Sequence, residues 1–120
     1  MKEFALIFRM SDNGNAAPQP TPAQIQERMT IWTNWMGGIA ARNQLVNGGS
    51  RLGLNGSKTV RADKSVTDGP YVEVKEFING YIIVRANMVE EAVEIARECP
   101  ILYGGGKVEV RPLVTPENNE

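Results

Sequence analysis

The residues with the clearest capacity for chemistry lie between positions 67 and 85, which read TDGPYVEVKEFINGYIIVR. The stretch opens with an Asp68-Gly69-Pro70 turn, in which aspartate can cap the turn, glycine accepts unusual φ values and proline stiffens the next segment. Side chains alternate between the two sides of an extended segment, so Tyr71, Glu73 and Lys75 share one side. This arrangement predicts a pocket wall that binds substrate, and a solvated strand edge is the alternative interpretation.

Asp68 itself has two interpretations. It either serves only the turn, a role that asparagine could also fill, or points into a cleft as a ligand contact and general base. Because the chain has no histidine, proton transfer near neutral pH would need a carboxylate with a raised pKa or a lysine with a lowered pKa. A close Glu73–Lys75 pair would instead keep both groups charged. We therefore expect Glu73 and Lys75 to bind ligand, and Asp68 to be the catalytic residue if the protein is an enzyme.

A second charged group comprises Arg85 and the alternating side chains of the last predicted strand, Lys107, Glu109 and Arg111. A salt-bridged surface is one interpretation of this group. If the strand turns its charged side toward the ligand site, Arg111 can bind a carboxylate or a phosphate through two parallel hydrogen bonds. We therefore add Arg111 to the expected substrate-binding residues.

The composition excludes several classes of site. With no histidine and one cysteine, Cys99, the chain cannot build an ordinary zinc site, a histidine-based triad or an internal disulfide. We expect no metal and no cofactor, so any reaction would be acid–base chemistry of the lyase or isomerase kind. The 13 basic and 14 acidic residues nearly balance, which leaves no long-range field to attract nucleic acid or an anionic membrane. The lone cysteine is typical of a reducing cytoplasm, which is the expected location.

The first part of the chain is expected to form a strand and a long helix. Phe4 to Arg9 is apolar on both sides, as in a central strand that is covered on both faces. Thr21, Pro22 and Gln24 predict a helix start with a capping box. The apolar face of this helix, at spacings of three and four, comprises Ile25, Met29, Trp32, Met36 and Ile39. We expect the helix to end at Asn47-Gly48-Gly49.

A hairpin is expected next, because Asn55-Gly56 is a strong turn signal between possible strands at 51–54 and 58–61. The remaining expected elements are a buried strand at 80–86, a helix capped by Asn87 and stopped by Pro100, and a strand at 107–111.

With the hairpin strand set aside, this order is the βαββαβ arrangement of a ferredoxin-like α+β fold. Helices of that fold cover one face of the sheet, yet the strands at 4–9 and 80–86 are apolar on both faces. A second copy of the sheet is the simplest cover for the other face. The pattern therefore predicts a homodimer, an α/β barrel in which two sheets pack face to face. The predicted domain spans residues 1–114, and residues 115–120 form a C-terminal tail.

The chain also resembles the YCII-related superfamily, in the branch whose proteins carry a D-G-P-[FY] motif, here Asp68-Gly69-Pro70-Tyr71. The similarity extends over nearly the whole chain, and the D-G-P-Y-x-E-x-K-E segment at 68–76 is its specific part. The resemblance implies a dimeric α/β barrel with this segment near the cleft. A His-Asp pair is proposed to act in the cleft of some members, and this chain cannot have that pair because it lacks histidine.

Two functions remain open from the sequence. The first is a homodimer that binds a small polar metabolite in the cleft, with or without cofactor-free acid–base activity. The alternative is a non-enzymatic regulatory or protein-interaction module, since the resemblance links the D-G-P-[FY] branch to transcription initiation. Neither function involves direct contact with nucleic acid or with a membrane.

Overall fold

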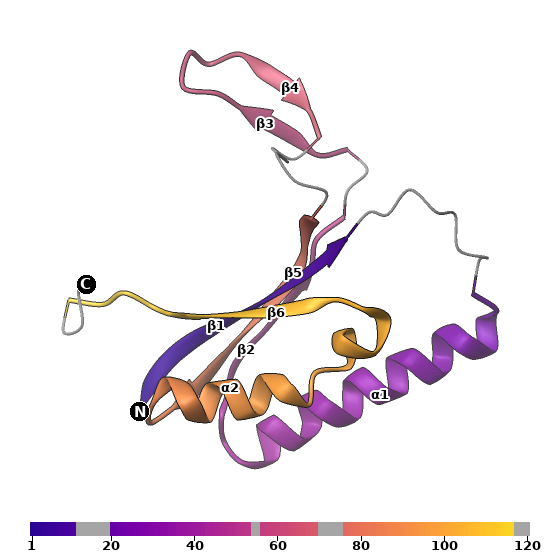
Figure 1. The fold of residues 1–120 in the computed structure, drawn as a ribbon, viewed down its shortest axis with the longest axis vertical. Coiled ribbons are helices and arrows are strands. Elements are labelled where there is room, and N and C mark those ends of the chain that lie inside the picture. Colours follow the sequence, from indigo (N-terminus) through magenta and orange to yellow (C-terminus); the bar gives the residue numbers. More distant parts are fainter. Residues whose placement is uncertain (12–19, 54–55, 70–75, 117–120) are drawn as a thin grey trace.

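The computed structural model describes residues 1–11, 20–53, 56–69 and 76–116 (Figure 1). The elements are β1 (Lys2–Ser11), α1 (Pro22–Ala41), β2 (Leu45–Arg51), β3 (Lys58–Val60), β4 (Val66–Asp68), β5 (Glu76–Ala86), α2 (Val89–Arg97), the 3₁₀ helix η1 (Pro100–Gly104) and β6 (Lys107–Pro112). Within these ranges, no helix combines the length and the apolar character needed to cross a bilayer.

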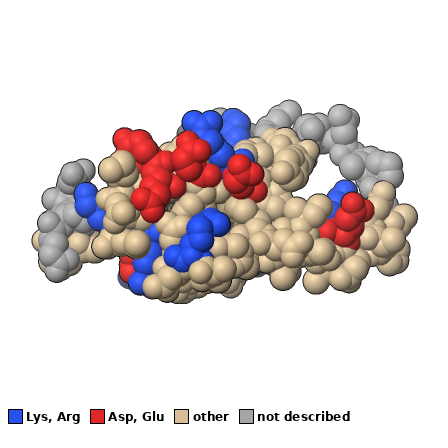
Figure 2. Space-filling model, turned by 90° about the horizontal axis from the view of Figure 1, so that it is seen from below, with Lys and Arg blue, Asp and Glu red and all other residues tan. Residues whose placement is uncertain are grey.

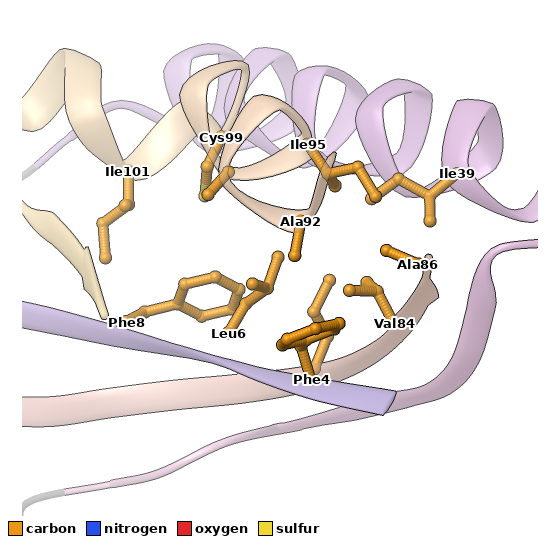
Figure 3. Close-up of a cluster of buried hydrophobic side chains, with 12 residues drawn as sticks. Phe4, Leu6, Phe8, Ile39, Val84, Ala86, Ala92, Ile95, Cys99 and Ile101 are labelled. Carbon is orange, nitrogen blue, oxygen red and sulfur yellow. The ribbon is translucent and has the colours of Figure 1, made fainter. Parts of the chain in front are cut away.

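Four of the strands form one antiparallel sheet in the order β2-β5-β1-β6. The two strands that are apolar on both sides, β1 and β5, take the central positions, as their composition predicted. Both helices lie on the same side of this sheet (Figures 1 and 3). The α+β class is confirmed, and the arrangement is compatible with a ferredoxin-like fold.

The hydrophobic core lies between the sheet and the helices (Figure 3). Alternate residues of β1 and β5 point into it, and Leu6, Ile82 and Val84 are at most 1% exposed. Ile39 from α1 and Ala92 from α2, both fully buried, close the core from the helical side. Burial of one large aliphatic side chain contributes about 1.5–3 kcal/mol. The alternation that directs these residues to the helices directs their neighbours to the opposite face.

The start of α1 is confirmed in detail. The Thr21 backbone N–H donates to Gln24 Oε1 at 2.9 Å, and the Gln24 N–H donates to Thr21 Oγ1 at 3.2 Å, which completes the predicted capping box. Only the C-terminal half of the apolar face is well covered. Ile39 is fully buried, whereas Ile25 and Met29 near the start are 45% and 58% exposed.

The end of α1 was predicted too late. The helix ends at Ala41, and Asn47-Gly48-Gly49 belongs to β2. The register of β2 against β5 shifts between Asn47 and Ser50, where Gly49 has a φ of 62° and its N–H donates to Asn47 Oδ1 at 2.7 Å. A glycine in the left-handed region is typical of a β-bulge. These glycines therefore bend a strand and do not stop a helix.

The predicted strand pairing of the hairpin was wrong. In the described part of the chain, the segment 58–60 pairs with β4, whereas a pairing with 51–54 was predicted, so the extra element is a separate two-stranded sheet. Its turn satisfies its own polar groups: the Arg61 N–H donates to Ser65 O at 2.8 Å, and Asp63 Oδ1 accepts from the Ser65 N–H at 2.9 Å. This local hydrogen bonding stabilises the turn at 61–65. The predicted Asn55-Gly56 turn lies partly outside the described residues.

The second helix also differs at its start. The N-cap residue of α2 is Met88, which makes no side-chain cap hydrogen bond, and not Asn87. Glu90 and Glu91 in the first turn favour the helix through its dipole instead. The strand predicted at 107–111 is confirmed as β6.

Candidate functional site

The candidate site is the face of the sheet that points away from both helices. We call it the open sheet face. It comprises Glu3, Ala5, Ile7 and Arg9 of β1, Tyr81, Ile83 and Arg85 of β5, and Lys107, Glu109 and Arg111 of β6. Val108 and Val110 pack against the core, so alternation along β6 turns Glu109 and Arg111 to this face.

The centre of the open sheet face is apolar. Cross-strand pairing sets Ile7 beside Tyr81, and Ala5 beside Ile83. Ile7, Tyr81 and Ile83 keep intermediate exposure because no helix in the described ranges covers them. The tyrosine adds a hydroxyl group to an otherwise hydrophobic floor. This floor suits the apolar body of a ligand or the same face of a second subunit.

A chain of charged groups borders the apolar centre along β1 and β6. Glu109 accepts from Arg9 Nε at 2.9 Å through Oε1, and from Arg111 Nη1 at 2.8 Å through Oε2. Arg111 first, and Arg9 second, lower the pKa of Glu109 below its usual value, because both donate hydrogen bonds to its charged form. One carboxylate thus holds two guanidinium groups. The Arg111 side chain remains 66% exposed, so it can donate further hydrogen bonds to an anion.

Arg85 adds a third arginine to this face. It pairs in register with Glu3 on β1, and its Nε is buried without a hydrogen-bond partner among the residues described. Leaving a buried donor unpaired costs about 1–3 kcal/mol. The arginines outnumber the two glutamates, so the open sheet face has an excess of positive charge, although the whole chain carries a net charge of −1.

The structure separates the predicted site residues. Arg111 lies on the open sheet face, where it forms an ion pair with Glu109. Asp68 ends β4 on the hairpin, where its side chain is 90% exposed and paired with Lys58. The hairpin stands away from the sheet (Figure 1), so one chain does not bring Asp68 and Arg111 together. Tyr71, Glu73 and Lys75 lie outside the described residues.

Sequence reasoning missed Tyr81, Arg9 and the apolar residues of the open sheet face as site candidates. The signal was present, because β1 and β5 are apolar at both alternating sets of positions. The sequence did not, however, show the order of the strands in the sheet. Only the order places Glu109 between Arg9 and Arg111, which are distant in sequence.

A groove of about 430 Å³ lies on the helical side of the protein, between α1 and α2. Its lining residues are Asn34, Trp35, Gly38, Arg42, Gln44, Glu91, Glu94, Ile95 and Glu98. Gln44, only 8% exposed, donates to Glu91 Oε1 at 2.8 Å and accepts from Arg42 Nε at 3.1 Å. Because of these two hydrogen bonds, the polar groups of Gln44, Glu91 and Arg42 at the base of the groove are already paired. Figure 2 shows acidic side chains gathered on the helical side of the molecule, with basic side chains close by.

Comparison with known protein families identifies the family of this chain. The family model that matches describes a YCII-related domain, and the match covers residues 24–115. No curated protein matches the chain. The matched region includes three strands of the main sheet, both α-helices and the hairpin, which is well over half of the chain. The chain therefore belongs to the YCII-related domain family.

Proposed function

We propose that this protein is a homodimer that binds a small anionic metabolite between two open sheet faces. In this arrangement the two sheets pack face to face as a dimeric α/β barrel, and the chain is a member of the D-G-P-[FY] branch. The single observation that carries the proposal is the open sheet face itself. It combines an apolar centre with a border of arginines that the nearby glutamates neutralise only in part.

The need for a second copy follows from exposure. Ile7, Tyr81 and Ile83, each of intermediate exposure, form a contiguous apolar strip along the two central strands with the largely buried Ala5. Soluble proteins rarely leave such a strip open to water. Two sheets that pack face to face lie about 10 Å apart, close enough for the side chains of both inner faces to interdigitate. A second copy of the same face would cover the strip with matching side chains.

The chemistry of the border selects the ligand class. Arg111 is held by Glu109 through Nη1, which leaves its other N–H groups for a carboxylate or a phosphate. The Tyr81 hydroxyl can add a hydrogen bond, and Ile7 and Ile83 can contact an apolar body. A small carboxylate with an aliphatic or aromatic body fits this combination.

Binding is the core of the proposal, and cofactor-free acid–base activity is its extension. Asp68 as the catalytic base stays a prediction, because within one chain its carboxylate is exposed on the hairpin and paired with Lys58. Any contact between Asp68 and the open sheet face would have to come from the second copy. Glu73, Lys75 and Tyr71 likewise stay predicted ligand contacts.

The first test is the assembly state. Sedimentation analysis over a dilution series should show a dimer at micromolar concentration, since an interface formed by two sheets is of the obligate type. A species with the monomer mass of 13.2 kDa at all concentrations would remove the barrel.

The second test is ligand binding, measured as a shift in melting temperature with acetate, succinate, benzoate and inorganic phosphate. A ligand at 100 times its dissociation constant stabilises the protein by about 2.7 kcal/mol. Arg111→Gln should abolish the shift. Arg97→Gln is the matched control, because the Arg97 side chain is 67% exposed and also pairs with a glutamate, but on α2. An equal response in both variants would exclude Arg111 as the anion contact.

A protein-interaction module is the second candidate, and the groove between α1 and α2 favours it. Glu91, Glu94 and Glu98 line one wall of the groove, which would suit a basic segment of a protein partner. A reversal of charge at Glu94 and Glu98 would then weaken partner binding. The same change would leave the carboxylate response of the open sheet face intact.

A further inference from the structure

A hairpin lies at one end of the longest axis of the molecule, away from the main sheet (Figure 1). We call residues 57–69, which include β3 and β4, the hairpin arm. Within the described ranges, its two strands pair only with each other, in a sheet of their own. The projection stretches the molecule to 45 × 38 × 19 Å with a radius of gyration of 16.2 Å. A compact domain of this length would have a radius of gyration of about 14 Å.

The hairpin arm is internally well organised. Asp63 Oδ1 accepts from both the N–H and the hydroxyl of Ser65, at 2.9 and 2.6 Å, and Lys64 adopts a φ of 71° to complete the turn. Near the base, Thr59 Oγ1 donates to Gly69 O at 2.7 Å, and Lys58 pairs with Asp68 across the strands. These contacts give the arm a defined shape, which a contact surface requires.

The two faces of the hairpin arm differ in character. Val60 and Val66 are cross-strand partners on one face, where they are 67% and 59% exposed and lie beside the Lys58–Asp68 ion pair of the same face. Thr59 and Thr67 are partners on the opposite face. A two-stranded hairpin is marginally stable in water by itself, and its stability increases when its apolar face packs against another element. No other element of the described chain provides that cover.

We propose that the hairpin arm is an interaction surface for a second copy of this chain, with the Val60–Val66 face in the contact. The proposal rests on the homodimer of the proposed function. The arm is attached between β2 and β5, the pair of strands at one edge of the main sheet. A copy that covers the open sheet face lies next to this edge, so the base of the arm borders the second copy directly.

The length of the hairpin arm supports this contact. Each leg has about six residues from base to tip, which at about 3.3 Å per residue gives a reach of about 20 Å. Packed sheets lie about 10 Å apart. The arm is thus long enough to extend past the partner's sheet and contact its edge. Since a two-fold axis relates the copies, each dimer would contain two such contacts.

Two substitutions at adjacent positions test the contact. Val66→Glu places a charge on the face that carries the two valines. Thr67→Glu places the same charge on the opposite face of the same strand. Val66 and Thr67 are both exposed, so each variant introduces its charge at a solvent-accessible position. We expect the dimer dissociation constant, measured by sedimentation, to rise at least tenfold for Val66→Glu and less than threefold for Thr67→Glu. Equal dissociation constants for the two variants would overturn the assignment of this face.

The outcomes separate this proposal from the dimer itself. A wild-type protein that is monomeric at all concentrations would refute both, whereas a wild-type dimer that Val66→Glu leaves intact would refute the arm contact alone.

A second measurement does not depend on the variants. Amine crosslinking of a mixed ¹⁴N/¹⁵N dimer should give links from Lys64, at the tip of the arm, to lysines of the other isotope. Links from Lys64 only within one isotope would contradict the proposal.

Discussion

The bulge in β2 allows a prediction whose size comes directly from the geometry. Gly49 has a φ of 62°, and a Cβ at this position would lie 1.7 Å from the carbonyl oxygen of Tyr81. Real Cβ atoms essentially never lie within 3.0 Å of a non-bonded heavy atom. The backbones of β2 and β5 must therefore move apart by about 1.3 Å, the difference between 3.0 and 1.7 Å. Gly49→Ala should therefore break the pairing of β2 with β5 beside the candidate site.

The expected loss has two parts. The left-handed conformation costs a residue with a Cβ about 1–2 kcal/mol. Separation of the strands removes at least one ladder hydrogen bond and local packing, so the total reaches about 3 kcal/mol. For a chain of this size, such a loss lowers the melting temperature by about 10 °C.

The matched control is the neighbouring glycine. A Cβ on Gly48 would meet only Met36 Cε, at 3.4 Å, which is ordinary contact. Gly48→Ala should change the free energy of unfolding by less than about 1 kcal/mol. Urea denaturation, followed by the fluorescence of Trp32 and Trp35 and at a fixed protein concentration, measures both variants, because both indoles pack on Phe8 in the core. If the two variants unfold at the same urea concentration, the bulge does not need glycine and the reasoning is refuted.

Three further predictions concern the core and the open sheet face. Leu6→Ala should lower the free energy of unfolding by about 3–5 kcal/mol in urea denaturation, because Leu6 is fully buried between sheet and helices. Arg85→Met should leave that free energy unchanged or raise it by about 1 kcal/mol, since it removes a buried and unpaired Nε; a clear loss would show that Arg85 has a structural partner. The ion pairs of Glu109 lower its pKa below the usual 4.5, so they stabilise the fold above about pH 4.5, and this contribution is lost as the pH falls through the lowered value. Glu109→Gln should remove that part of the acid dependence, which amounts to less than about 1 kcal/mol because the group is partly exposed, and identical pH profiles would contradict this account.

The features predicted correctly from sequence are those that depend on nearby residues. The capping box of α1 involves groups three residues apart, and the alternation of β1, β5 and β6 sets the side of each side chain residue by residue. The absence of histidine limited the possible chemistry without any reference to the fold. Where two local signals competed, prediction failed. Asn47-Gly48-Gly49 suits a helix end as well as a bulge, and the segment at 58–60 pairs with 66–68 where a pairing with 51–54 was predicted.

The sequence by itself determined the α+β class, the helix start, the central strands with two apolar faces and the lack of histidine chemistry. Tertiary structure alone decided which of these residues meet. Arg9 and Glu109 are 100 positions apart, and only the order β2-β5-β1-β6 brings them within 2.9 Å. The same order leaves the open sheet face without a cover from the described residues, and the hairpin with Asp68 lies away from Arg111. The physical reason is that strand pairing joins distant segments through backbone hydrogen bonds, which are alike for all residue types, so the local pattern does not record the partner.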